Sequence, residues 1–284
     1  MKFSIITPIY NMALSLDKSI QSVLAQSFTD WELLIVDNCS TDHPDEIVKR
    51  YSDDKRIRLL SIDEKDRSKA RNHGIANSNG DYITFLDADD TLHEDYLKTY
   101  AAIFENAQNV ITFSDLILIK GDEKTTWSKS KYSGLHKLEY CLNHGNMAFA
   151  APTELFDKFK FEGQTGEDRH LLARASEFYE LHFTRRPYYN YFDHVKIETR
   201  EQFLEGKDMN LQSLKDIYNN LEENYSFNYP YQKALFEMFI KSFYVAMSLK
   251  YKKEAGEILK ELPHPFSVRS FVMYIKAGLY FILK

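Results

Sequence analysis

The stretch Tyr82-Ile83-Thr84-Phe85-Leu86-Asp87-Ala88-Asp89-Asp90 passes from an apolar run directly into three carboxylates. The turn signal Gly80-Asp81 precedes it, so the apolar run is predicted to be a short buried strand over 82–86. In open α/β sheets, ligands bind beyond the carboxyl ends of the strands. The acidic residues therefore mark one edge of a predicted sheet as the place for a binding site.

Crowded carboxylates repel one another, and each loses hydration when the chain folds. A hard divalent cation relieves both costs, because Mg²⁺ and Mn²⁺ prefer oxygen ligands. Mg²⁺ usually takes one or two carboxylates and completes its shell with water and substrate phosphates, so the motif indicates a diphosphate-bearing substrate. The alternative is an acidic loop in which Asp90 or Thr91 caps the helix that follows.

Apolar runs and helical patterns alternate along the first half of the chain. Leu16, Ile20, Val23 and Leu24 recur at helical spacing and form one apolar face. Strands that alternate with helices predict an α/β fold with a mainly parallel, doubly wound sheet. The expected strands cover 3–7, 31–36, 57–62, 82–86, 110–119, 147–151 and two runs within 178–192 that Arg185-Arg186-Pro187 separates; the expected helices cover 44–51, 68–76, 93–106 and 167–175.

The pattern changes near residue 197, beyond which long helical patterns dominate. We therefore expect one domain over 1–197 and a helical C-terminal region over 198–284. Residues 264–284 include no acid but carry Arg269, Lys276 and Lys284 among aromatic and aliphatic residues. This stretch is expected either to lie on an anionic membrane surface as a basic amphipathic helix or to pack on the domain.

Composition narrows the class of protein. The chain has 284 residues, of which 44% are hydrophobic, and its formal net charge of -6 argues against nucleic acid as a partner. Its two cysteines suit a reducing compartment. The apolar start is short and broken by Pro8, and no run of about twenty uncharged apolar residues occurs, so we expect a cytoplasmic protein without a spanning helix.

A second polar stretch, Val36-Asp37-Asn38-Cys39-Ser40-Thr41-Asp42, begins where another strand is expected to end. A carboxylate at Asp37 could accept a hydrogen bond from a base imide N–H or a ribose hydroxyl. The alternative is a polar turn, since Asn, Ser, Thr and Asp are good turn formers, and this is the better interpretation for residues 40–42.

Four motifs occur in order within residues 3–95, and together they resemble the signature of glycosyltransferase family 2, which has the fold called GT-A. They are Thr7-Pro8-Ile9-Tyr10-Asn11, the Asp37 stretch just described, Ala70-Arg71-Asn72-His73-Gly74, and Phe85-Leu86-Asp87-Ala88-Asp89-Asp90. The family often has Asp-Asp-Gly where this chain has Asp37-Asn38-Cys39, which weakens any inference about the base. The fold implied is a Rossmann-like, mainly parallel sheet with flanking helices.

The resemblance also implies roles for particular residues. It places a nucleoside pocket at the end of the first strand, a metal site at the acidic motif, and a UDP-sugar with Mn²⁺ or Mg²⁺ as the ligands. His194 is a further candidate for the metal or the diphosphate, although a lone exposed histidine is more often without such a role. The implied positions are Pro8 and Tyr10 at the nucleoside, Asp37 at the uracil edge, Arg71 at the nucleotide, Asp87 at the ribose, sugar or metal, and Asp89 as the main metal ligand.

An inverting sugar transfer also needs a base for the acceptor hydroxyl. Gly166-Glu167-Asp168 resembles the family's Glu-Asp pair, which opens a helix beside the acceptor site. We therefore predict Asp168 as the base, supported by Glu167. The alternative is a helix start enriched in acids that suit its dipole.

The resulting expectation is a catalytic domain with a nucleotide-sugar half over about 1–110 and an acceptor half over about 111–197. It would transfer a hexose or N-acetylhexosamine from a UDP-sugar to a saccharide or lipid-linked saccharide of a bacterial surface glycan. Two rivals are a metal-dependent nucleotidyltransferase or phosphohydrolase and a non-catalytic nucleotide-sugar-binding module. No Gly-x-x-x-x-Gly-Lys phosphate loop occurs in the sequence, which counts against the first rival.

Overall fold

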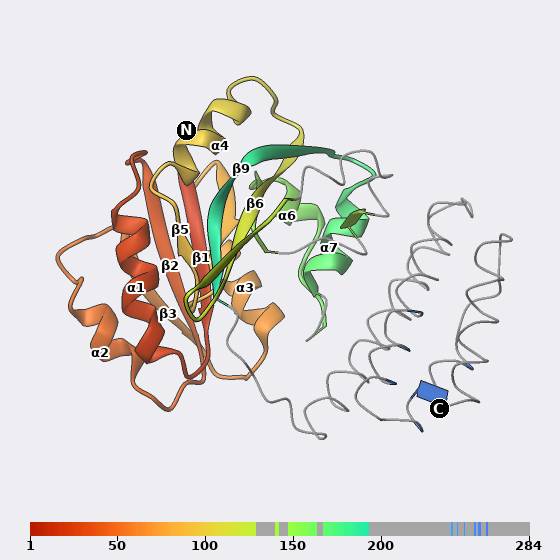
Figure 1. The fold of residues 1–284 in the computed structure, drawn as a ribbon. Helices are drawn as coiled ribbons and strands as arrows, with labels where there is room; N and C mark the ends of the chain where they lie inside the picture. Colours follow the sequence, from red (N-terminus) through yellow and green to blue (C-terminus); the bar gives the residue numbers. More distant parts are fainter. Residues whose placement is uncertain are drawn as a thin grey trace, which may run out of the picture.

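The structure is a computed structural model, and it describes residues 1–128, 140–141, 147–163 and 167–192 (Figure 1). It also describes seven single residues further along, at positions 240, 243, 247, 253, 255, 256 and 260. The predictions for His194, for most of 198–284 and for all of 264–284 therefore lie outside the described residues. Within them, no helix is both long enough and apolar enough to span a bilayer.

The strands of the described residues form one nine-stranded sheet with the order β3-β2-β1-β4-β8-β6-β9-β5, and β7 pairs with β6. The expected α/β class is confirmed. Its first half is wholly parallel, because β1 pairs in parallel with β2 and β4, and β2 with β3. This half contains β1 (Phe3–Ile9), α1 (Ala13–Leu24), β2 (Trp31–Asn38), α2 (Pro44–Lys49), β3 (Ile57–Ile62), α3 (Arg67–Ala76) and β4 (Tyr82–Phe85).

The second half of the sheet is mixed. β8 runs antiparallel to both β4 and β6, while β6 and β9 are parallel to each other. Consequently β6 and β9 run in the direction of β4, and their carboxyl ends lie at the same edge of the sheet. The elements are β5 (Thr91–Leu92), α4 (Tyr96–Phe104), β6 (Val110–Lys120), β7 (Glu123–Trp127), β8 (Phe149–Pro152), α6 (Leu155–Lys158), α7 (Glu167–Ala175) and β9 (Glu180–Phe192).

Two expectations for the second half are wrong. Residues 180–192 form one strand rather than two, because Pro187, which has no N–H, sits opposite Asp115 where the β6–β9 register shifts at a bulge. Neither Asp90 nor Thr91 caps a helix: Thr91 starts β5, and the residue that precedes α4 is Asp95.

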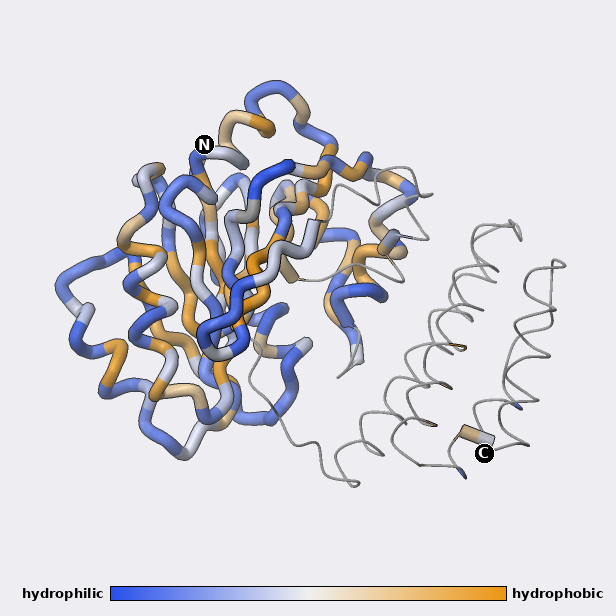
Figure 2. The backbone as a smooth tube through the Cα atoms, in the orientation of Figure 1, coloured by the Kyte–Doolittle hydropathy of each residue, from blue (hydrophilic) through white to orange (hydrophobic). Residues whose placement is uncertain are grey.

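Helices cover both faces of the sheet, and the alternation of buried residues along the strands assigns each helix to a face. Phe3 and Ile5 of β1 pack in one core with residues of α1, α2 and α4. Ile6 packs in a second core with residues of α3, α6 and α7. Figure 2 shows hydrophobic colouring along the strands between these helices, while hydrophilic residues are frequent in the helices and loops around them. On α1 the predicted apolar face is buried except for Leu24, which is 37% exposed.

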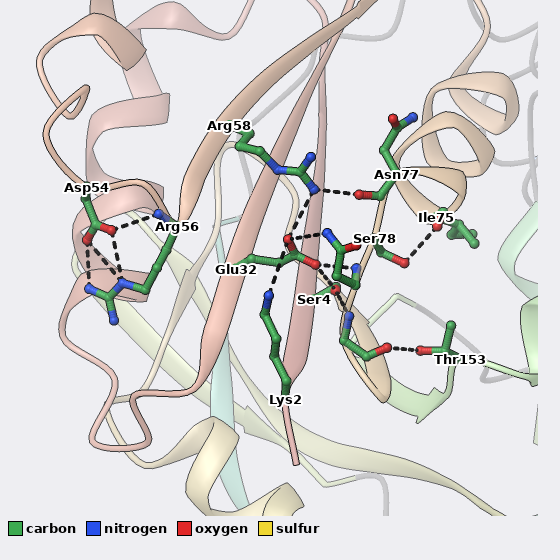
Figure 3. Close-up of polar contacts among 12 residues, drawn as sticks. Lys2, Ser4, Glu32, Asp54, Arg56, Arg58, Ile75, Asn77, Ser78 and Thr153 are labelled. Atoms are coloured by element: carbon green, nitrogen blue, oxygen red, sulfur yellow. Dashed lines mark hydrogen bonds and ion pairs between the residues drawn. The ribbon is translucent and has the colours of Figure 1, made fainter.

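The amino-terminal edge of the parallel strands holds a buried polar cluster around Glu32 (Figure 3). The Glu32 carboxylate accepts hydrogen bonds from Ser4 Oγ at 2.7 Å, from Arg58 Nη2 at 3.1 Å, and from the backbone and side chain of Asn79. Burial alone would raise the pKa of Glu32, but these hydrogen bonds and Lys2 hold that pKa below its ordinary value. The ionised glutamate therefore ties β1, β2 and β3 to the turn before β4.

Candidate active site

A cavity of about 320 Å³ opens at the opposite, carboxyl-terminal edge of the sheet. Its wall is built from the ends of β1, β2, β4 and β9 and from the start of α3, as expected for this class of sheet. Among the described residues, it is lined by Pro8, Ile9, Tyr10, Met12, Asn38, Arg67, Asp87, Ala88, Asp89 and Tyr191. Four of the predicted site residues, Pro8, Tyr10, Asp87 and Asp89, thus meet at one cavity.

Tyr10 directly follows β1 and is 37% exposed, and the Lys65 ammonium lies 3.9 Å from the centroid of its ring. This cation–π contact covers an aromatic face that could stack on a base or a sugar. The loop that follows is fixed by the loop after β2. Asn11 accepts the Thr41 backbone N–H at 2.8 Å, and Asp42 accepts that of Ala13 at 2.8 Å, so the polar residues 40–42 serve as the turn expected of them.

Asp37 lies at the end of β2 but is not among the residues that line the cavity. Its Oδ1 accepts the Ser40 N–H at 2.9 Å, which closes the turn. Cys39 has a φ of +64°, a left-handed conformation that glycine adopts at least cost, and this explains the family's frequent glycine at that position. Asn38, which precedes it, lines the cavity and accepts the Asp66 N–H at 2.7 Å.

The three carboxylates of the acidic motif have different surroundings. Asp90 is 1% exposed and accepts the Phe192 N–H at 2.9 Å, and burial together with the nearby Asp87 raises the pKa of Asp90 to about 8. Asp87 and Asp89 instead face the cavity, and the Asp87 side chain is 38% exposed. Asp90 is thus held inside the protein, and Asp87 and Asp89 are the two acids of the motif that line the cavity.

Arg71 lies on the second turn of α3, four positions beyond the wall residue Arg67. It is 2% exposed and pairs with Glu167 Oε1 and, at 3.3 Å, with Asp87 Oδ1. Burial would lower the pKa of Arg71, but Glu167, Asp87 and Asp168 together raise it, so the guanidinium stays charged. Arg71 thus joins the acidic motif after β4 to the start of α7 and does not itself line the cavity.

Glu167 and Asp168 open α7, as the sequence predicted. Glu167 is 4% exposed and held by Arg71, whereas Asp168 is half-buried and its Oδ1 accepts the Arg169 N–H at 2.8 Å. Burial and the neighbouring Glu167 raise the pKa of Asp168 above its ordinary value. A raised pKa makes this carboxylate a better proton acceptor at neutral pH. Neither acid is among the described residues that line the cavity.

The remaining residues of the Ala70–Gly74 motif position α3. A Cβ on Gly74 would lie 2.6 Å from Ile6 Cγ2, so glycine allows the helix to pack closely on β1. Asn72 exchanges two hydrogen bonds with the Phe161 backbone, at 2.8 and 3.0 Å, and Ser68 Oγ donates to the Gly163 carbonyl. The same helix therefore packs on the sheet and holds the segment that leads toward α7.

The residues present fit a divalent metal ion held largely by its substrate. No group of three or more acidic, histidine or cysteine side chains gathers as a metal site in the described parts of the chain. Two carboxylates facing a cavity, Asp87 and Asp89, suit Mg²⁺ or Mn²⁺, which would complete its shell with phosphate oxygens and water. The predicted third ligand, His194, lies outside the described residues.

Sequence reasoning missed three polar wall residues, Asn38, Arg67 and Tyr191, of which Asn38 directly follows the predicted Asp37. Arg67 lies four positions before Arg71 on α3, so helical spacing places both on one face and could have revealed it. Tyr191 is 43% exposed at the end of β9, and only the pairing of β9 with β5 and β6 brings it to the cavity. No local signal in the sequence points to that placement.

Solved structures share this architecture. The structure of S. aureus TarS 1–349 in complex with UDP matches with a TM-score of 0.69 at 18% identity, over 98% of this chain and 89% of that one. Mannosyltransferase PcManGT from Pyrobaculum calidifontis, in complex with GDP-Man and Mn²⁺, matches with a TM-score of 0.62 at 15% identity, over 100% of this chain and 81% of that one. At these identities the likeness concerns the fold, which is that of the GT-A glycosyltransferases.

The sequence comparison identifies the group within that class. The profile of the family described as "Glycosyl transferase family 2" matches residues 4–163, more than half of the chain, and the chain belongs to this family. "Glycosyltransferase GlyA" of Streptococcus pneumoniae is 30% identical over 61% of this chain and 28% of its own length. "Putative teichuronic acid biosynthesis glycosyltransferase TuaG" of Bacillus subtilis is 34% identical over 42% of this chain and 48% of its own length. The chain thus spans about half or less of these relatives.

Proposed function

We propose that this protein is an inverting glycosyltransferase that transfers a hexose or N-acetylhexosamine from a UDP-sugar to a saccharide or lipid-linked saccharide acceptor of a bacterial surface glycan. The observation that carries the proposal is the cavity where Tyr10, Asp87 and Asp89 meet at the carboxyl ends of β1 and β4. The aromatic ring can stack on the base of a nucleoside diphosphate, and the two carboxylates can hold a metal ion that binds its phosphates.

In the proposed reaction, the acceptor hydroxyl oxygen attacks the anomeric carbon of the donor while the bond from that carbon to the diphosphate oxygen breaks. Asp168 takes the hydroxyl proton, and its raised pKa favours this transfer. Asp89 and Asp87 would hold Mn²⁺ or Mg²⁺, which supplies charge neutralisation for the departing UDP. Arg71 keeps Glu167 and Asp87 in place, so Glu167 is a positioning residue for the base rather than a second base.

Similar proteins support this choice of substrates. Two solved structures of S. aureus TarS contain UDP or UDP-GlcNAc. The S. aureus relative named poly(ribitol-phosphate) beta-N-acetylglucosaminyltransferase TarS is 32% identical over 42% of this chain and 21% of its own length. Because PcManGT was solved with GDP-Man, the donor base requires direct measurement.

The test begins with the full chain and a thermal-shift series of UDP-GlcNAc, UDP-glucose, UDP-galactose and GDP-mannose, each with Mn²⁺ or with EDTA. A ligand that binds the native state raises its apparent stability by mass action. Candidate saccharide acceptors are then added, and the released product is identified. UDP release with a glycosylated acceptor supports the proposal. Pyrophosphate release would indicate a nucleotidyltransferase, and stabilisation without turnover would indicate a binding module.

We further propose that 1–197 is the catalytic domain, with donor and acceptor halves that meet near residue 110, and that 198–284 is a helical region. The basic, acid-free stretch 264–284 is the proposed contact with the inner face of the cytoplasmic membrane. Flotation with anionic liposomes tests this contact on the full chain and on a chain that ends at Leu262. Equal binding by the two proteins would contradict the proposed membrane contact.

A further inference from the structure

Arg67 is the one basic side chain among the described residues that line the cavity. It is the first residue of α3, and its side chain is 59% exposed. The side chains of Asp87 and Asp89 line the same cavity. The wall thus carries two acids that can hold a metal ion and one guanidinium, a planar group with five N–H donors.

The ion pair that Arg67 makes with Glu167 is long. Its Nη1 lies 3.9 Å from Glu167 Oε1, the same oxygen that Arg71 contacts much more closely. Arg71 is 2% exposed and lies one helical turn further along the same face of α3. Since Arg71 already compensates the buried Glu167, the exposed guanidinium of Arg67 is available to a second anion.

The surroundings of Arg67 indicate the kind of anion. A divalent ion on Asp87 and Asp89 would convert the acidic part of the wall into a positively charged one, and an anion in the cavity would then meet cations on two sides. Guanidinium groups bind phosphate through two parallel hydrogen bonds. A phosphate group is therefore the chemistry that this combination of residues selects.

We infer that Arg67, and not Arg71, binds the diphosphate of the nucleotide-sugar donor, while Arg71 holds Asp87 and Glu167 in position. This inference rests on the proposed function. It reverses the role that the family resemblance implies for Arg71, because a side chain that is 2% exposed and paired with two carboxylates does not reach the cavity. Arg67 would also stabilise the charge that UDP gains as the sugar leaves.

The experiment is calorimetric titration of the full chain in Mn²⁺ with uridine monophosphate and with UDP. Arg67→Gln removes the positive charge, whereas Arg67→Lys retains the charge but lacks the planar guanidinium. Lys69→Gln is the matched control. Lys69 is an exposed α3 residue whose ammonium pairs with Glu64 outside the cavity. Because Arg67 is exposed, all three variants should keep the melting temperature of the wild type within a few degrees.

Loss of a charged hydrogen bond to phosphate corresponds to about a ten- to hundredfold loss of affinity. We expect that loss for UDP in Arg67→Gln, a smaller loss in Arg67→Lys and none in Lys69→Gln. Both Arg67 variants should affect the binding of UMP less than that of UDP. The kcat/KM for the donor should fall in parallel, with the acceptor KM unchanged.

Wild-type affinity for UDP in Arg67→Gln would overturn the inference while leaving the proposed function intact. The same holds if UDP binding is unchanged and only the KM of a phosphate-bearing acceptor, such as a ribitol phosphate oligomer, rises. In that case the Arg67 guanidinium binds a phosphate of the acceptor instead of the donor diphosphate. A wild-type protein that does not bind UDP in Mn²⁺ would overturn both the inference and the proposed function.

Discussion

Acidic residues have opposite surroundings at the two edges of the parallel strands. At the amino-terminal edge, the Glu32 side chain is 6% exposed and its carboxylate accepts hydrogen bonds from Ser4, Arg58 and Asn79 (Figure 3). At the carboxyl-terminal edge, Asp87 and Asp89 line a cavity of about 320 Å³. A carboxylate whose oxygens are saturated by the protein stabilises the fold, whereas one that faces a cavity can bind a ligand.

The largest effect is expected at Asp89. Asp89→Ala should lower metal-dependent sugar transfer by about a thousandfold or more, because the proposed main ligand of the diphosphate-bound metal is removed. UDP release with and without Mn²⁺ measures it, and the melting temperature should barely change. Asp53→Ala is the control, since Asp53 is an exposed acid that is not part of the cavity wall. Full activity of Asp89→Ala would contradict the metal assignment.

Asp168→Asn should lower kcat by about 10²- to 10⁴-fold, which is the usual contribution of a general base. Donor affinity should stay unchanged, because proton removal alone is lost. Only the ionised Asp168 can accept a proton, and its pKa lies above the ordinary value. Wild-type kcat should therefore fall as the pH decreases through that raised pKa, and this acid limb should disappear from the residual activity of the variant. A variant that retains near wild-type kcat would refute the assignment.

Arg71→Met tests whether the buried ion pairs of the cavity edge are structural. Removing one partner of a buried pair typically costs about 3–5 kcal/mol of unfolding free energy, because Glu167 would stay buried without its closest cation. Arg58→Met is the matched comparison at the other edge, where the Arg58 side chain is 38% exposed and the expected loss is smaller. Urea denaturation of both variants measures the difference, and equal losses would contradict the structural role given to Arg71.

The smallest effect is expected from Glu32→Gln, at about 1–3 kcal/mol of unfolding free energy and with transfer activity unchanged. The pKa of Glu32 is lowered in the folded state, so its ionised form contributes stability above the unfolded-state pKa. That contribution is lost as the pH falls through the lowered pKa, and the variant should lack this loss. Urea midpoints at pH 7 and pH 3.5 test this, and an identical pH dependence in the two proteins would count against it.

Much of the fold could be predicted from local patterns. The strand at 57–62 and the helix at 167–175 have the bounds that the apolar and acidic patterns indicated. The acidic motif was correctly placed at a strand end, yet Asp90 could not be told from its neighbours. Its burial depends on the Phe192 N–H, which comes from a strand about a hundred residues away. The single strand through Pro187 was missed because the strand accommodates this proline through a bulge opposite Asp115.

The sequence by itself determined the alternation of strands and helices, the position of the carboxylates at a strand end and the membership of a glycosyltransferase family, since each depends on residues close together in the chain. Only the tertiary structure decided which arginine is buried and which lines the cavity. Arg67 and Arg71 share one helix face, but only Arg71 of the two is buried, in close contact with Glu167, which lies 96 positions beyond it. Contacts at such separations depend on how the sheet and its helices pack, and no local pattern encodes them.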